Sequence, residues 1–163
     1  NQQILNNIKK GIRLDIARRF TREAKDLGIK IHGAFIMGLP GETRETINET
    51  IRFALEIEPD TVQASMAAPY PGTELYREAL ANGWLTNGRL VSDGGTQVSA
   101  LSYPHLSHTE IFGSVEEFYR RFYFRPRKIF SMAGEMIGNP RVLRRRLAEG
   151  AQFLRFLSRR RQS

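Results

Sequence analysis

The chain has 163 residues and a formal net charge of +8, and it contains no cysteine. This length is enough for one domain with a hydrophobic core, and the sequence has no run of eighteen apolar residues that could cross a bilayer. Without cysteine, these residues can form no disulfide, no thiolate nucleophile and no cysteine-ligated metal centre.

The first residues, NQQILNNIKKG, lack the apolar segment of a signal peptide. The sequence starts at Asn1 and not at Met, which fits a processed or excised piece at least as well as a complete protein. A short helix is predicted over residues 4–10 and a longer one over residues 13–27. The longer helix has its apolar residues on one side and Gly28 just after its end.

The stretch of residues 29–55 organises the rest of the chain. It starts with an apolar run typical of a strand buried on both faces, and Leu39-Pro40-Gly41 ends that strand. Thr43 is predicted to cap the following helix, with Glu42 and Glu45 placing negative charge near the positive end of the helix. The apolar residues of this helix recur at helical spacing: Ile47, Ile51, Ala54 and Leu55.

A second strand and helix follow at similar spacing. The apolar run 61–68 ends in a Pro/Gly turn, and Thr73 is predicted to cap a helix over residues 74–81, which Gly83 closes. Alternating helices and strands favour parallel strands in an α/β fold. Two parallel strands cannot cover both faces and both edges of a sheet, so we expect a section of a larger barrel or open sheet that self-associates when isolated.

The second half of the chain is predicted to be mainly helical. Residues 82–102 are rich in Gly, Asn and Ser and predict a loop or a small hairpin. Ser107-x-x-Glu110 is a capping-box pattern that opens a helix reaching about Phe124. Two further helices are predicted, over residues 127–137 and residues 141–159.

The C-terminal region is strongly basic. Residues 125–163 hold eleven Lys and Arg against two acidic residues, whereas the rest of the chain is close to neutral. The last predicted helix has a Leu-rich face, and five arginines lie opposite it: Arg144, Arg145, Arg155, Arg159 and Arg160. Such a helix either lies on an anionic membrane or packs its Leu face on the body and leaves the arginines solvated. Nucleic acid is not an expected partner, because the aromatic residues follow the helix period and form no stacking platform.

Two Gly/Pro turns are the sharpest candidates for a binding site. In the turn 38–43, two glycines let the backbone approach a ligand and the helix start offers amide donors, although the same residues also suit a plain strand-to-helix turn. The turn 68–73 would lie beside it if both strands belong to one sheet. Gln63 and Ser65 alternate with apolar residues and would share one sheet face, toward a ligand or toward other polar groups.

The histidines do not form a convincing metal site. His105 and His108 have the spacing of a metal pair, but Pro104 breaks the backbone before them and no third ligand stands at a suitable distance in the sequence. We interpret both as structural, and His32 as a hydrogen-bonded histidine in a strand or at its rim. The sequence contains no GxSxG, GxxxxGK[ST] or GxGxxG motif.

Four segments in the first half resemble the second half of a radical SAM catalytic barrel, in the branch that carries an N-terminal cobalamin-binding domain. They are ILNNIKKGI (4–12), AKDLGIKI (24–31), GAFIMGLPGETRETINETIRFA (33–54) and PYPGTELY (69–76). The resemblance implies a TIM-like partial (βα)6 barrel whose last strands point their carboxyl ends at S-adenosylmethionine and a [4Fe–4S] cluster. It divides the chain into a barrel section (1–85), a loop or hairpin linker (86–106) and a helical C-terminal region (107–163).

Three segments of the second half are similar to the hopanoid-biosynthesis-associated members of this family. They are DGGTQ (93–97), LSYPHLS (101–107) and FYRRFYFRPRKIF (118–130). The family also includes the anaerobic Mg-protoporphyrin monomethyl ester cyclase type and methyltransferases. The resemblance implies a hydrophobic substrate such as a lipid or hopanoid, cobalamin as a further cofactor, and a cytoplasmic enzyme that contacts the inner membrane peripherally. The alternative is a non-catalytic adaptor that binds a membrane or a partner.

The chain departs from the family in one large respect. The family's Cys-x-x-x-Cys-x-x-Cys loop, which ligates the cluster, has no counterpart here, and neither has the Glu-Ser-Gly-like strand end expected before residue 4. The resemblance therefore implies that an N-terminal half is missing, that this piece is inactive alone, and that none of its residues is catalytic or a cluster ligand. It places Gly38, Pro40, Gly41 and Glu42 at the rim of the cofactor pocket. The lumen near the adenosyl group would be lined by Ile36, Gln63, Ser65, Ala67 and Pro69.

Overall fold

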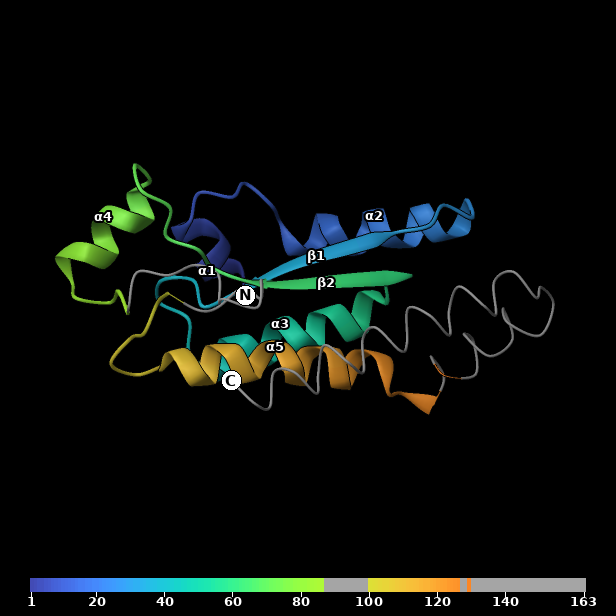
Figure 1. The fold of residues 1–163 in the computed structure, drawn as a ribbon. Coiled ribbons are helices and arrows are strands. Elements are labelled where there is room, and N and C mark those ends of the chain that lie inside the picture. Colours follow the sequence, from blue (N-terminus) through green and yellow to red (C-terminus); the bar gives the residue numbers. More distant parts are fainter. Residues whose placement is uncertain (87–99, 127–128, 130–163) are drawn as a thin grey trace. The chain divides into compact units, whose positions relative to one another are not determined.

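The computed structural model describes residues 1–86, 100–126 and 129 (Figure 1). Seven elements follow in order: α1 (Gln2–Asn7), α2 (Leu14–Asp26), β1 (His32–Met37), α3 (Arg44–Ile57), β2 (Thr61–Met66), α4 (Glu74–Ala81) and α5 (His108–Tyr123). The chain divides into two compact units, Asn1–Phe118 and Tyr119–Ser163. The two strands, the turns that follow them and the segment 103–111 lie within the first unit.

The predicted mixed α/β organisation is confirmed for the described residues. β1 and β2 pair in parallel, in a register that runs from His32 beside Thr61 to Met37 beside Met66. The pairing continues past the strands, because the Ala67 N–H donates to the Met37 carbonyl oxygen at 2.8 Å. The carboxyl ends of both strands therefore lie at the same edge, and the turns that follow them start side by side.

The predicted helix caps are confirmed. The side chain of Thr43 accepts the Thr46 N–H at the start of α3, and that of Thr73 accepts the Tyr76 N–H at the start of α4. At the start of α5, the Ser107 Oγ accepts the Glu110 N–H at 3.3 Å, and the Glu110 carboxylate accepts the Ser107 N–H at 2.7 Å. These local hydrogen bonds fix where each helix begins, because the first amides of a helix have no partner inside it.

In the part of the chain that the structure describes, helices cover one face of the strand pair and leave the other open. Figure 1 shows α3 and α5 on the same side of the strands, where the Phe35 and Phe118 rings lie 5.1 Å apart. Met37 and Phe118 are fully buried there, and the residues of the other face alternate with them. That other face is formed by His32, Ala34, Ile36, Thr61, Gln63 and Ser65.

The expectation that the first strand is buried on both faces was wrong for the structure described. His32, Ala34 and Ile36 are exposed, and Ile36 keeps 45% of its surface open to solvent. The described helices cover one face only. The apolar run therefore predicted the strand correctly, but it did not predict whether a second layer covers the strand. Within the described ranges, no helix is both long and apolar enough to cross a membrane.

Several predictions from the sequence fall on residues outside the described ranges. These are most of the predicted loop or hairpin, the two helices at 127–137 and 141–159, and the basic surface of Arg144, Arg145, Arg155, Arg159 and Arg160. The described ends of the linker pair in antiparallel fashion. The Thr86 N–H donates to the Ala100 carbonyl at 3.0 Å, and the Ser102 N–H donates to the Trp84 carbonyl at 2.8 Å.

Candidate functional site

The turn after β1, residues 38–43, is built around two left-handed glycines. Gly38 and Gly41 both have φ of +79°, a conformation that side-chain-bearing residues rarely adopt. Glu42 turns back under this loop, and its Oε2 atom accepts the N–H groups of Gly38 at 2.6 Å and Leu39 at 3.0 Å. The Glu42 side chain is therefore an internal acceptor that fixes the turn.

The Glu42 carboxyl is 2% exposed, and this burial raises its pKa above the ordinary value. The two backbone N–H donors act in the opposite direction, because they stabilise the charged form. Burial is the larger of the two effects. The turn thus holds a carboxyl group, that of Glu42, whose charged form is disfavoured by burial. The sequence pattern did not indicate this burial.

A second segment, residues 103–111, holds the same turn from outside. The Tyr103 hydroxyl donates to the Gly38 carbonyl at 2.9 Å, and the His105 Nε2–H donates to the Glu42 carbonyl at 3.0 Å. Tyr103 is buried, and burial followed by the nearby Glu42 charge raises the pKa of its hydroxyl. The hydroxyl therefore stays protonated and keeps its donor. Ile111 packs so closely that a Cβ atom on Gly38 would lie 2.7 Å from its Cγ2.

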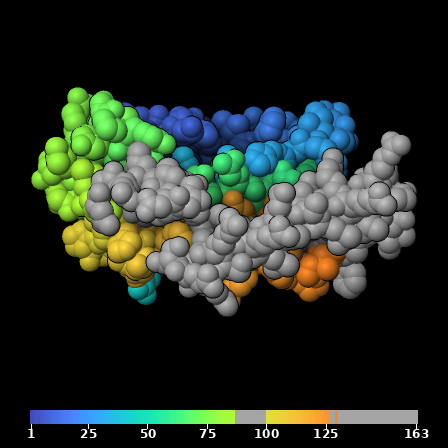
Figure 2. All heavy atoms as spheres, in the orientation of Figure 1, coloured from blue at the N-terminus to red at the C-terminus, as the bar shows by residue number. Residues whose placement is uncertain are grey.

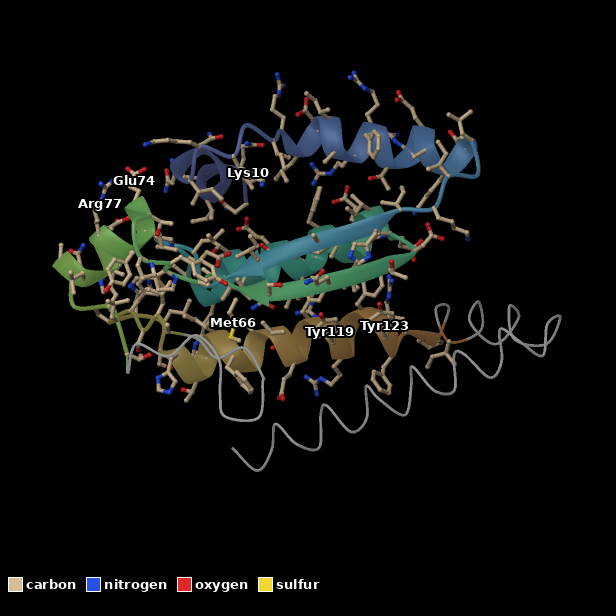
Figure 3. The ribbon with its side chains drawn as sticks, turned by 45° about the horizontal axis from the view of Figure 1, so that its top comes forward. Lys10, Met66, Glu74, Arg77, Tyr119 and Tyr123 are labelled. Atoms are coloured by element: carbon tan, nitrogen blue, oxygen red, sulfur yellow. The ribbon has the colours of Figure 1, made fainter. Side chains whose placement is uncertain are left out.

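The outer side of the turn faces a cleft of about 630 Å³. Its walls come from the end of α1, the turn after β1, α4 and the segment after α4. Across its mouth, Lys9 Nζ lies 3.4 Å from Glu74 Oε2, and Figure 3 shows Glu74 at the start of α4. The lining combines apolar surface with a charged rim: Asn7, Ile8, Lys9, Leu39, Pro40, Gly41, Glu74, Leu75, Glu78 and Trp84. Such a lining suits a ligand with an apolar body and polar or charged ends.

The residues that the sequence singled out fall into three groups. Pro40 and Gly41 line the cleft, and Gly38 and Glu42 support them from beneath. Ile36, Gln63 and Ser65 lie on the open face of the strands, where Ile36 pairs with Ser65. Ala67 and Pro69 are buried beyond the end of β2. The structure thus gathers the first group at one cleft, whereas the second group lies on the sheet face.

Sequence reasoning missed the residues that join the turn to the rest of the site. Trp84, the sole tryptophan, lines the cleft and meets the Tyr103 ring edge-on at 5.0 Å between ring centroids. His105 is a hydrogen-bond donor to the turn, and His32 lies with its Nδ1 2.8 Å from Thr61 Oγ1. No local pattern marks these pairings of Trp84, Tyr103 and His105, because they join segments far apart in the chain.

Known proteins similar to this chain are enzymes. The sequence matches no family model. It is 35% identical over 127 residues to an uncharacterized methyltransferase of Pyrococcus horikoshii, which covers 77% of this chain and 27% of that protein. It is 36% identical over 112 residues to the anaerobic magnesium-protoporphyrin IX monomethyl ester cyclase of Cereibacter sphaeroides, covering 67% of this chain and 17% of that protein.

A third relative is a putative methylthiotransferase of Methanocaldococcus jannaschii, 37% identical over 75 residues, or 46% of this chain and 17% of that protein. The chain thus spans about a quarter or less of the length of each of these relatives. Their names, two group transferases and a cyclase, agree with the radical SAM resemblance of the sequence.

Proposed function

We propose that this chain forms the C-terminal section of a radical SAM catalytic barrel and supplies one wall of its cofactor and substrate pocket. The observation that carries the proposal is the parallel pairing of β1 and β2. Their ends, Met37 and Met66, lie side by side, and the turn that follows Met37 lines a cleft. In open or barrel α/β folds, binding sites form at this end of the strands. The similarity to transferases and a cyclase points in the same direction.

The chain's residues do not fit the cluster that such an enzyme requires. Cysteine is absent from the sequence, and no three His, Asp or Glu side chains of the described residues come close enough together to hold a metal. Thiolate ligands would therefore come from a missing N-terminal half. The reductive chemistry belongs to that cluster and to S-adenosylmethionine, and the residues of this chain bind, orient and exclude water.

For S-adenosylmethionine the residues present do fit. The open sheet face combines the apolar side chain of Ile36 with the hydrogen-bonding groups of Gln63 and Ser65, which suits a nucleoside. The turn offers Pro40 and Gly41 as a close-approaching backbone wall, supported by the buried Glu42. In the complete barrel, the covering strands would turn this open face into a lumen.

The substrate we propose is hydrophobic, with a lipid or hopanoid as the first candidate. The relatives favour a second candidate, one-carbon transfer or ring closure on a substrate of another type, because they are named as a methyltransferase, a methylthiotransferase and a Mg-protoporphyrin cyclase. Cobalamin would serve as a further cofactor. An anionic membrane surface would be contacted by five arginines of the last predicted helix: Arg144, Arg145, Arg155, Arg159 and Arg160.

The test is anaerobic reconstitution of the full-length protein with iron and sulfide, followed by reduction in the presence of S-adenosylmethionine. We expect cleavage to 5′-deoxyadenosine or transfer of a methyl group, and no turnover by the present chain alone. Absence of both reactions from a protein whose [4Fe–4S] cluster is confirmed spectroscopically would contradict the proposal. Retained binding to anionic vesicles in that case would instead support the adaptor.

A further inference from the structure

The turn after β1 is held at both ends by side chains that come more than sixty residues later. The Tyr103 hydroxyl bonds to the carbonyl of Gly38, at the start of the turn, and His105 bonds to the carbonyl of Glu42, at its end. Both bonds go to main-chain oxygens, so they fix the path of the backbone whichever side chains the turn carries. Figure 2 shows α4 (green) and the first described residues after the gap, which start at residue 100 (yellow), at the same end of the unit.

These two side chains are also connected to the wall of the cleft. The rings of Tyr103 and His105 stack with centroids 5.8 Å apart and planes 19° apart. On its other side, Tyr103 contacts Trp84, which lines the cleft. Trp84, Tyr103 and His105 therefore form a continuous row of rings from the cleft to the backbone of the turn. This row connects the cleft wall to the backbone of the turn.

The middle of the turn is closed by one backbone hydrogen bond, from the Glu42 N–H to the Leu39 carbonyl at 3.0 Å. Gly41 is exposed in the cleft, and a Cβ atom there would meet nothing closer than 3.7 Å, at Ile4 Cδ1. Within the described ranges, the Gly41 N–H has no hydrogen-bond acceptor. The position of this amide, which can donate to a ligand, thus depends on the hydrogen bonds within the turn and on how firmly its two ends are held.

We infer that Tyr103 and His105 are positioning residues of the proposed site, which set the position of the Gly41 amide and the cleft wall through the carbonyls of Gly38 and Glu42. The inference rests on the proposed function for the identity of the ligand, S-adenosylmethionine. It extends that function to residues 100–107, outside the strands, and assigns them to the binding step rather than to chemistry.

The first test measures ligand binding by the full-length protein. Tyr103→Phe and His105→Leu each remove one donor, and we expect the KM and Kd for S-adenosylmethionine to rise roughly five- to tenfold with kcat nearly unchanged. His105→Gln keeps an N–H donor of similar reach and should restore binding. Matched controls are Tyr76→Phe and His108→Leu, which remove the same groups away from the turn. The Kd is read from Trp84 fluorescence, identified by its loss in Trp84→Phe.

Unchanged Kd in both donor-removing variants would overturn the inference, as would a loss that His105→Gln fails to restore although the variant melts like the wild type. A loss of the same size in the two controls would also overturn it.

The second test uses the present chain and no ligand. Amide hydrogen exchange of Glu42 and Thr43, whose N–H groups are hydrogen-bonded within the turn and its cap, should become at least about tenfold faster in Tyr103→Phe and His105→Leu, while the amides of β2 keep their protection. Equal exchange in variants and wild type would contradict the inference. The exchange can be faster in the variants while the full-length wild-type enzyme neither binds nor cleaves S-adenosylmethionine. That result would support the positioning role and refute the proposed function.

Discussion

Gly38 and Gly41 have the same left-handed backbone conformation but different surroundings. Alanine substitutions at the two positions therefore separate the cost of the backbone conformation from the cost of a steric clash. At Gly41 an added Cβ meets only ordinary contacts, and Gly41→Ala should cost about 1–2 kcal/mol for the left-handed backbone alone. At Gly38 the Cβ would also collide with Ile111, and overpacking typically adds a further ~1–3 kcal/mol. Urea unfolding of both variants measures the difference, and equal losses would contradict this account.

The buried Glu42 carboxyl should make the stability of the fold depend on pH in an unusual direction. Its folded-state pKa is raised above the ordinary 4.5, so the native state binds the proton more tightly than the unfolded state. The stability that this group contributes is therefore fully present below pH 4.5 and is lost as pH rises through the raised pKa. Relative to Glu42→Gln, which cannot titrate there, the wild type should lose free energy of unfolding over that interval.

Glu45→Gln is the matched control, because the Glu45 pKa is lowered, chiefly by a hydrogen bond from the Thr43 side chain. Its contribution should be present above the ordinary pKa and lost as pH falls through the lowered one, the opposite sign. Urea unfolding of the three proteins between about pH 3.5 and pH 8 measures both differences. The explanation fails if the two variants differ from the wild type with the same sign.

The sequence could predict those parts of the site that depend on local contacts, and it could not predict those that join residues far apart in the chain. The turn itself was predicted, because Gly38, Pro40 and Gly41 have conformational preferences that act locally. The residues themselves predicted Glu42 as a charge near a helix start, and the family resemblance placed it at the rim of the cofactor pocket. Its burial beneath the turn was not predicted, since burial depends on what packs above it. Tyr103 bonds to Gly38, 65 positions earlier, and His105 bonds to Glu42, 63 positions earlier. No periodicity in the sequence indicates such a pairing.

At the scale of elements, the helix starts are set by local hydrogen bonds that can be removed one at a time. Thr43 and Thr46 bond reciprocally at the start of α3, the helix that covers β1. Thr43→Ala should lower the free energy of unfolding by about 1 kcal/mol, whereas Thr43→Asn, another favoured N-cap, should retain most of it. Thermal and urea unfolding give both values. Equal loss in the two variants would show that the hydroxyl does not act as a cap.

The starts of the helices were predictable because local hydrogen bonds set them. Which faces of the strands are covered was not predictable. The capping residues Thr43, Thr73 and Ser107 carry their function in their own side chains, so the starts of three helices agree with the sequence. Burial of a strand depends on elements that another part of the chain supplies. The apolar run before Gly38 therefore predicted β1 correctly, while its second covering layer is absent from the described residues.

For the molecule as a whole, the described residues expose several large apolar side chains close together in the sequence. α2 and its flanks expose Ile12, Ile16, Phe20, Leu27 and Ile29, and Phe20 and Leu27 keep 61% and 76% of their surface. The described sheet has two strands, one open face and two outer edges. Both features are expected where further elements of a barrel would pack. In the isolated chain, another copy of the chain can cover the surfaces that the described residues leave open.

The present chain should therefore self-associate, with a mass in sedimentation velocity that rises with concentration. Phe20→Lys combined with Leu27→Lys should shift this association to at least about tenfold higher concentration, because it places charge on the exposed apolar stripe. Leu80→Lys, at an equally exposed site on α4 (63% exposed), is the matched control and should leave association unchanged. A wild-type chain that stays monomeric at all concentrations would show that this surface needs no cover. Equal effects of the two substitutions would instead assign the association to net charge.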